Sequence, residues 1–119
     1  MIKLNPKKKG KRVTDSAYLD AVAALGCCLC GQPAQIHHVR AGEGAGQRAS
    51  DYRSIPLCQK HHQTGGYGIA IHAGQYTWEN NYGTEEHYLE WTWDGLEITQ
   101  AIRAKWRRRN FEEEQKEED

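Results

Sequence analysis

The sequence predicts an α+β fold: a small single domain in which a short β-hairpin leads into a helix and further helices surround this unit. The hairpin is indicated by two short, partly β-branched segments, AQIHHV at residues 34–39 and SIPLC at residues 54–58, with a long glycine-rich stretch between them. A helix is expected to begin within residues 59–64, and residues 76–83 and 84–109 are expected to be mostly helical. The 119 residues of the chain are enough for one domain.

Residues 16–25 are predicted to form an amphipathic helix, because their apolar residues recur at intervals of three and four. Thr14 or Asp15 is a suitable N-cap, and Gly26 is a suitable end. This helix leads the chain directly into a cluster of cysteines. The later aromatic residues at mixed helical spacings are predicted to be core: Trp78, Tyr82, Tyr88, Trp91 and Trp93.

The core is expected to be thin, because 38% of the residues are hydrophobic and the chain has one Phe and one Met. Small domains of this kind gain stability from disulfides or a bound metal. The chain has no apolar segment long enough to cross a bilayer, and its first residues, MIKLNPKKKGKR, lack the apolar stretch of a signal peptide. We therefore expect a cytoplasmic protein whose four cysteines are metal ligands or free thiols.

The two ends of the chain carry opposite charge, although the net charge is zero. Residues 1–13 are expected to form a flexible basic arm, residues 14–110 the folded domain, and residues 111–119 a disordered acidic tail. A second basic cluster lies at residues 103–109. Local basic charge favours contact with a polyanion, and solvated, disordered ends would show the same composition.

The spacing of cysteines and histidines predicts a structural zinc site. Cys27-x-x-Cys30 offers two thiolates from one turn, and Cys58-x-x-His61 offers two more donors from the start of a helix. Together they make a tetrahedral Cys3His set, whose bound ion would contribute folding free energy. Cys28 is expected to be a buried thiol outside the set. The alternative is a group of buried free cysteines. If the second pair were spaced CxxxH, His62 would take the place of His61 in the zinc site.

Apart from His61 and His87 the chain has four histidines, and two of them, His37 and His38, are adjacent on a predicted strand. Neighbouring strand residues point to opposite faces, so one of the two can bind a metal while the other faces a substrate. His62 lies at the other end of the same hairpin-helix unit and is expected to meet His37 across it.

The order of these residues resembles the HNH (ββα-metal) nuclease motif: a His pair, a glycine-rich loop, a polar residue, PLC, and a helix with His. The longer string HHVRAGEGAGQRASDYRSIPLCQKHHQTGGYGIAIHAGQ is similar to the phage family of RecA-dependent nucleases typified by Ref. The resemblance covers roughly residues 25–90. It implies a zinc-stapled ββα-metal core and a phage or prophage protein acting in the cytoplasm of a bacterial host.

The resemblance implies a catalytic metal site. In HNH enzymes the first histidine of the pair and a histidine of the following helix bind a divalent ion, which implies this role for His37 and His62. The usual third position, about one helical turn later, is Gly66 here, so His72 is the expected substitute. Mg²⁺, Mn²⁺ and Zn²⁺ are all candidates, and an all-histidine set favours the softer ions.

The resemblance also implies a general base. The second histidine of the pair, His38, would take a proton from the attacking water, as a neutral imidazole can near its ordinary pKa. The family's Asn that orients this base has no direct counterpart. Asp51 and Ser54 lie nearest to its place, and Asp51 is the better candidate because a carboxylate can fix the tautomer of an imidazole.

Several cations flank these histidines and are candidates for holding phosphates of DNA, although solvated loop charge is an equally ordinary reading. They are Arg40, Arg48 and Arg53 near the site, and Lys8, Lys9 and Arg12 in the arm. His87, on a polar helix, is expected to be structural or at the surface.

These expectations favour a metal-dependent DNA endonuclease that hydrolyses phosphodiester bonds in phage recombination, either on DNA generally or on DNA coated by a RecA filament. The alternative is a non-catalytic, zinc-stabilised module that binds nucleic acid or a recombinase. Such a module would need the Cys3His set and the basic arm, but it would have little use for the four further histidines.

Overall fold

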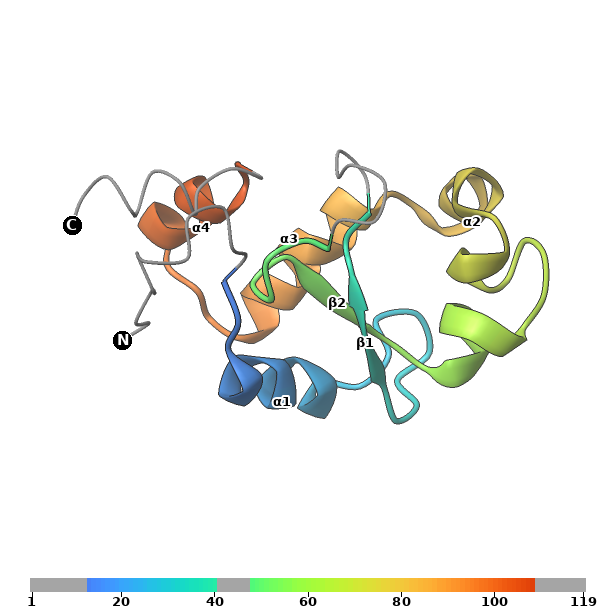
Figure 1. Cartoon of the computed structure of the whole chain (residues 1–119), viewed down its shortest axis with the longest axis horizontal. Coiled ribbons are helices and arrows are strands. Elements are labelled where there is room, and N and C mark those ends of the chain that lie inside the picture. The colour runs from blue at the N-terminus through green and yellow to red at the C-terminus, as the bar shows by residue number, and fades with distance from the viewer. Residues whose placement is uncertain (1–12, 41–47, 109–119) are drawn as a thin grey trace.

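The computed structural model describes residues 13–40 and 48–108 of the chain, which form a compact α+β fold of short helices and one two-stranded sheet. Figure 1 shows this sheet between α1 and α3, with α2 and α4 at opposite ends of the molecule. The elements in chain order are α1 (Ser16–Ala24), β1 (Gln35–His38), β2 (Ser54–Leu57), the π-helical turn η1 (Lys60–Thr64), the 3₁₀ turn η2 (Ile71–Ala73), α2 (Gln75–Tyr82), α3 (Glu85–Gly95) and α4 (Gln100–Trp106).

Helix α1 begins at Asp15, whose side chain accepts a hydrogen bond of 3.0 Å from the backbone N–H of Tyr18. This bond satisfies one of the donors that a helix N-terminus leaves unpaired. Gly26 follows the helix with a φ of 82°, in the left-handed region that favours glycine. The predicted start of this helix is therefore confirmed, with Asp15 as the cap, and the helix ends at Ala24, one residue before the predicted end.

The hairpin is also confirmed. Strands β1 and β2 are antiparallel, and His37 lies opposite Ile55 while His38 lies opposite Ser54. Pro56 lacks a backbone N–H, but its carbonyl oxygen accepts a bond of 3.0 Å from the N–H of Cys28. That bond ties the cysteine turn to β2 and so brings the two halves of the Cys/His pattern together.

The segment predicted to be mostly helical, residues 84–109, contains two helices, and the part of it that could have been helix or turn, EWTWDG, lies in the first. Thr84 caps α3 by accepting from the N–H of His87 at 3.1 Å, and Thr99 caps α4 in the same way. Between them Glu97 has a φ of 58°, which reverses the chain. The second helix therefore packs back on the first.

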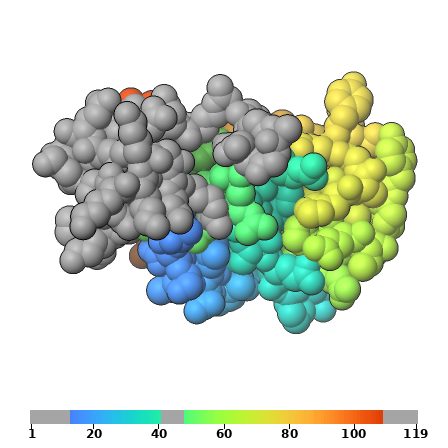
Figure 2. Space-filling view, viewed as in Figure 1, coloured from blue at the N-terminus to red at the C-terminus, as the bar shows by residue number. Residues whose placement is uncertain are grey.

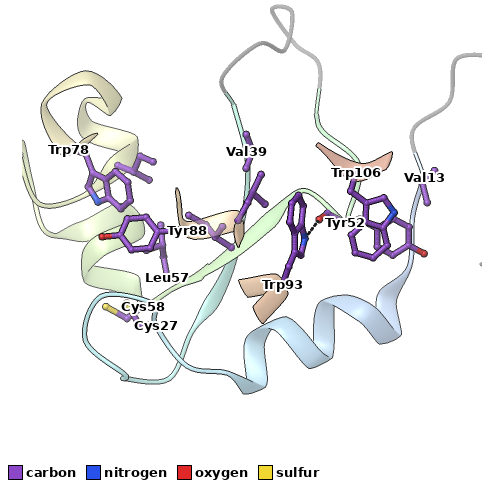
Figure 3. Packing of buried hydrophobic residues seen from close by; sticks show 13 residues of the cluster. Val13, Cys27, Val39, Tyr52, Leu57, Cys58, Trp78, Tyr88, Trp93 and Trp106 are labelled. Atoms are coloured by element: carbon purple, nitrogen blue, oxygen red, sulfur yellow. Dashed lines mark hydrogen bonds between the residues drawn. The ribbon is translucent and has the colours of Figure 1, made fainter. Parts of the chain in front are cut away.

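Aromatic side chains fill the two ends of the core, as Figure 3 shows. At one end Tyr52 stacks on Trp106 with ring centroids 4.4 Å apart, and the indole N–H of Trp93 donates to the carbonyl oxygen of Tyr52. Trp78 and Tyr88 occupy the other end. The predicted core role is thus confirmed for Trp78, Tyr88 and Trp93, while Tyr82 is only partly buried against the same cluster.

Two expectations about burial are corrected. Trp91 was predicted to be core but is 38% exposed, because the buried residues of α3 lie on the opposite face of that helix. Val13 was placed in the flexible arm but is 5% exposed, and its carbonyl oxygen accepts from the N–H of Asp51. The rest of the arm and the acidic tail at residues 111–119 lie outside the described residues. Within the part that the structure describes, no helix is both long and apolar enough to span a membrane.

Candidate functional site

The first cluster of donors consists of Cys27, Cys30, Cys58 and His61, whose ligand atoms all lie within 4.8 Å of one another. The Sγ atoms of Cys30 and Cys58 are 3.7 Å apart, and Nδ1 of His61 lies 3.2 Å from Sγ of Cys58 and 3.8 Å from Sγ of Cys27. Zn–S bonds of about 2.3 Å in a tetrahedron separate two sulfurs by about 3.8 Å. The four side chains can therefore hold a metal such as zinc.

Local structure explains how the cysteine turn forms. The backbone N–H of Gly31 donates to the carbonyl oxygen of Cys27 at 2.8 Å, which closes the turn, and Gly31 has a φ of 79°. The N–H of Leu29 points at Sγ of Cys27 at 3.4 Å, a contact that favours the thiolate form. Cys28 lies outside the cluster, and burial followed by the nearby Cys27 raises the pKa of its thiol to about 12. A thiol that stays protonated is a poor ligand, in agreement with the prediction that Cys28 is outside the set, although its side chain is only partly buried.

His61 and His62 are assigned to different clusters. They occupy consecutive positions in η1, where successive side chains point in different directions around the helix axis, so one helical turn can serve two sites. His61 lies with the cysteines, and His62 lies with His37 and His72. The structure thus places Cys58 and His61, spaced CxxH, in the same cluster.

The second cluster is formed by His37, His62 and His72, whose donor nitrogens also lie within 4.8 Å of one another. The three come from β1, η1 and η2, and Figure 2 shows the teal region that includes β1 next to the yellow-green region that includes η1 and η2. The ring centroids of His62 and His72 are 4.4 Å apart, and that of His37 lies 5.2 Å from the ring of His62. Three imidazoles in this arrangement make a donor set suited to a divalent transition metal.

The glycine-rich insertion brings His72 to this cluster. Gly66 occupies the place where a ligand one turn after His62 was expected, and its φ of 88° turns the chain. At the preceding residue, Gly65, a Cβ would lie 2.6 Å from the carbonyl oxygen of Lys60, so a side chain there is excluded. The chain thus turns back toward the cluster, and the third histidine, His72, comes from η2 and not from η1.

The ring of His62 is held and kept neutral. Its Nδ1–H donates to the side-chain oxygen of Gln35 at 2.8 Å, which leaves Nε2 for a metal. Burial, followed by the neighbouring histidines, lowers the pKa of His62 to about 4. Burial likewise lowers the pKa of His72, with His37 and Arg40 contributing. Neutral imidazoles carry the lone pair that a metal needs.

His38 and Asp51 form a pair beside this cluster. The Nε2–H of His38 donates to Oδ1 of Asp51 at 2.8 Å, and Oδ2 of Asp51 accepts from the backbone N–H of Asp15 at 2.7 Å. The hydroxyl of Ser54, the other candidate for orienting His38, donates instead to the carbonyl oxygen of Asp51. The aspartate is thus fixed by the start of α1 and in turn fixes the imidazole.

The histidines line a cavity of about 360 Å³. Its walls are the residues Ile36, His37, His38, Val39, Arg40, Arg48, His62, Gln63 and His72. Arg40 and Arg48 are exposed residues at this cavity, as a phosphate-binding role requires. Lys8, Lys9 and Arg12 lie outside the described residues.

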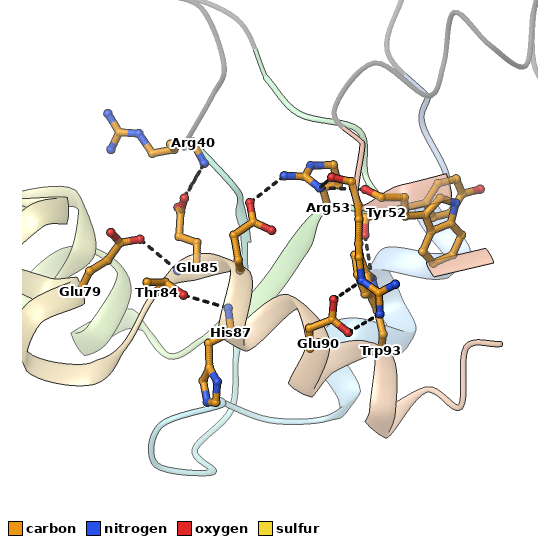
Figure 4. A network of polar contacts seen from close by, with 12 residues as sticks. Arg40, Tyr52, Arg53, Glu79, Thr84, Glu85, His87, Glu90 and Trp93 are labelled. Carbon is orange, nitrogen blue, oxygen red and sulfur yellow. Dashed lines mark hydrogen bonds and ion pairs between the residues drawn. The ribbon is translucent and has the colours of Figure 1, made fainter. Parts of the chain in front are cut away.

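Arg53 does not fit the predicted role in DNA binding. It is 2% exposed, its Nη1 donates to the carbonyl oxygens of Trp106 and Arg107, and its Nη2 pairs with Glu86 at 2.9 Å (Figure 4). These bonds join the start of β2 to the end of α4, where helix carbonyls lack partners of their own. The guanidinium is thus a structural tie.

Two arginines of the second basic cluster, Arg103 and Arg107, are engaged within the domain. Nη1 of Arg103 lies 2.6 Å from Asp94, and Arg107 forms two bonds to Glu90 at 2.6 and 3.0 Å. The hydrogen bond from Arg107 lowers the pKa of Glu90. His87 is exposed, in agreement with a surface role, and its ring packs against Tyr88.

Sequence reasoning missed two partners of the histidine cluster, Gln35 and Glu85. Gln35 precedes the His pair by two residues on β1 and therefore projects from the same face as His37, a signal that strand alternation offers. Glu85 contacts His37 from α3, at a separation of 48 residues, and nothing local to His37 indicates it.

The fold and the two Cys/His clusters define a small α+β protein that can hold metal. The chain belongs to the family described as "Protein of unknown function (DUF968)", which it matches over residues 3–96. It is also similar to "Uncharacterized protein YdfU" of Escherichia coli K12, with 31% identity over 80 residues, or 65% of this chain. The match covers 21% of that relative, so the chain spans about a fifth of its length. No solved structure matches the chain significantly.

Proposed function

We propose that this protein is a metal-dependent endonuclease that hydrolyses phosphodiester bonds in DNA. The observation that carries the proposal is the cavity in which the cluster of His37, His62 and His72 lies next to the His38–Asp51 pair. Such a cavity combines a place for a divalent ion with a held imidazole, the two requirements of single-metal phosphodiester hydrolysis.

The order of elements supports an HNH (ββα-metal) core. The antiparallel pair β1 and β2 is followed directly by η1, with His37 and His38 on the first strand and His62 on the helical turn. This is the order in which residues 37–75 resemble that nuclease motif. The cysteine cluster joins the turn before β1 to the end of β2 and would serve as the staple of this unit.

In the proposed reaction His38 is the general base. Because its Nε2–H is bonded to Asp51, proton transfer from the attacking water would fall to Nδ1. The carboxylate of Asp51 would then stabilise the imidazolium that forms, while its own bond to the backbone of Asp15 keeps it in place. The pair thus orients the base and supports its change of charge.

The other residues of the cavity hold the reacting groups. His37, His62 and His72 would bind the divalent ion, which when bound would stabilise negative charge on the phosphate and the leaving oxygen. Arg40 and Arg48 border the same cavity and would hold phosphates of the DNA strand. The resemblance to the Ref family extends the proposal to phage recombination and to DNA coated by a RecA filament.

The proposal is tested by cleavage of supercoiled plasmid and single-stranded DNA with Mg²⁺, Mn²⁺ or Zn²⁺, with and without RecA and ATP. Wild type is expected to cut in at least one arm, and His38→Ala to lower the rate by about 10²- to 10⁴-fold, the usual contribution of a general base. His87→Ala changes an exposed histidine outside the cavity and is expected to cut like wild type.

Two outcomes would contradict the proposal: no cleavage by wild type in any arm, or equal cleavage by His38→Ala. If the protein binds DNA or a RecA filament but does not cut, the result would instead support the alternative, a non-catalytic zinc-stabilised binding module. The metal content of the purified protein is measured alongside cleavage. It shows whether a protein that does not cut lacks the ion at the histidine site or holds the ion and has no activity.

A further inference from the structure

The carboxylate of Glu85 lies against the first proposed metal ligand, and the side chain is fully buried. Its Oε2 accepts the Nε2–H of His37 at 2.7 Å, across 48 residues of sequence. We infer that Glu85 is a positioning residue for the divalent ion: it fixes the tautomer of His37 that offers Nδ1 to the metal. This inference rests on the histidine metal site of the proposed function.

Several donors hold the carboxylate where it can do this. The backbone N–H of Arg40 lies 3.0 Å from Oε1 and 3.1 Å from Oε2, and the amide nitrogen of Gln75 lies 3.1 Å from Oε1. Glu79 accepts the backbone N–H of Glu85 at 3.0 Å, a contact visible in Figure 4. A buried charge is tolerated when hydrogen-bond donors surround it, and these donors also prevent the carboxylate from turning.

Glu85 is placed behind the ring of His37 and not among the ligands. Glu85 does not line the histidine cavity. Its carboxylate also lies outside the cluster of His37, His62 and His72, whose donor nitrogens are within 4.8 Å of one another. The Nε2 side of His37 therefore faces the protein interior, and Nδ1 remains for the ion. His62 shows the same arrangement with reversed nitrogens, because Gln35 takes its Nδ1–H and leaves Nε2.

The physical effect of such a partner is twofold. A carboxylate that accepts the second N–H of an imidazole restricts ring rotation and increases electron density at the other nitrogen, which strengthens metal binding. Glu85 also accepts a hydrogen bond from the backbone N–H of Arg40, and Arg40 borders the cavity. One side chain from α3 thus organises both the ligand and the strand end that carries a proposed phosphate contact.

The test uses Co²⁺ as the probe in protein that already holds one equivalent of zinc. Titration of Co²⁺ into wild type is expected to give the visible absorption of a nitrogen-ligated ion without sulfur charge transfer. Glu85→Gln keeps the shape of the side chain but removes its charge, and is expected to weaken this binding about 10-fold or more. Glu97→Gln removes an exposed charge outside the histidine cavity and is expected to bind Co²⁺ like wild type.

A second measurement on wild type does not depend on the folding of any variant. In protein loaded with a second equivalent of zinc, which would fill the histidine site, ¹⁵N NMR of the His37 ring is expected to show a protonated Nε2 and a metal-bound Nδ1. The inference is overturned if His37 is protonated on Nδ1, or if Glu85→Gln with an intact fold binds Co²⁺ as tightly as wild type. Weaker Co²⁺ binding by Glu85→Gln in a protein that never cuts DNA would support the inference and contradict the nuclease function. Absence of Co²⁺ binding at the histidines of wild type overturns both.

Discussion

Nε2 of His38 lies 2.8 Å from Oδ1 of Asp51, and the other oxygen of this carboxylate lies 2.7 Å from the backbone nitrogen of Asp15. The side chains of His38 and Asp51 are 14% and 4% exposed, so the pair is shielded but the imidazole still reaches solvent. The imidazole that we propose as general base is therefore held by a carboxylate that is itself fixed by the backbone.

The first prediction concerns this pair. Asp51→Asn keeps the size of the side chain but lets the amide nitrogen face His38, which disfavours the tautomer that donates from Nε2. The rate of DNA cleavage is expected to fall about 10- to 100-fold, as for other partners that orient a functional histidine. Steady-state cleavage kinetics measure the loss, and Co²⁺ titration is expected to show an unchanged histidine site. Asp20→Asn, on the exposed face of α1, serves as the matched control.

The second prediction concerns the cysteine cluster. Cys58→Ser removes one of four donors that lie within 4.8 Å of one another, so the variant is expected to lose its zinc and much of its stability. Cys28→Ser leaves the four donors intact and is expected to keep one equivalent of zinc. Zinc content after dialysis and thermal unfolding by circular dichroism measure both effects. Zinc retained at full occupancy by Cys58→Ser would show that the cluster is not the metal site.

The features that could be predicted from the sequence are those encoded within a few residues. CxxC and CxxH spacings place donors on one turn, and the two strands are short runs of suitable residues bounded by glycine-rich or turn segments. The membership of His72 in the second cluster came from resemblance and not from spacing, because the path of residues 65–71 depends on glycines with positive φ. No local pattern fixes where such a turn leads.

The features that could not be predicted depend on contacts between distant elements. Glu85 stands in the first turn of α3, where an acidic residue is ordinary at a helix N-terminus, yet its partner is on β1. Arg53 has the composition of loop charge, but it is buried because β2 and the end of α4 converge on it. For Trp91 the sequence did hold a signal, since the buried positions 88, 89, 92 and 93 of α3 define a face that excludes it.

The third prediction is a pH dependence of stability that comes from His62. Its pKa is about 4 in the folded protein, against an ordinary value of about 6.5. Between these values the unfolded chain binds more protons, so the free energy of unfolding falls as the pH falls through this window. Chemical denaturation is carried out between pH 7 and 5 on protein that holds one equivalent of zinc at the cysteine cluster and no metal at the histidines. It is expected to show a steeper loss of stability for wild type than for His62→Gln. Parallel curves for the two proteins would contradict this assignment.

The fourth prediction separates two arginines that look alike in the sequence. Arg53→Met removes a buried guanidinium and leaves the carbonyl oxygens of Trp106 and Arg107 without their donor, which is expected to cost about 2 kcal/mol of unfolding free energy. Arg48→Met changes an exposed residue at the cavity, so stability is expected to stay near that of wild type while DNA affinity falls. Urea denaturation measures the first quantity, and a filter-binding or anisotropy titration at fixed salt measures the second.

Equal loss of stability in the two variants would show that Arg53 is not the tie between β2 and α4. Unchanged DNA affinity in Arg48→Met would remove that residue from the proposed phosphate contacts.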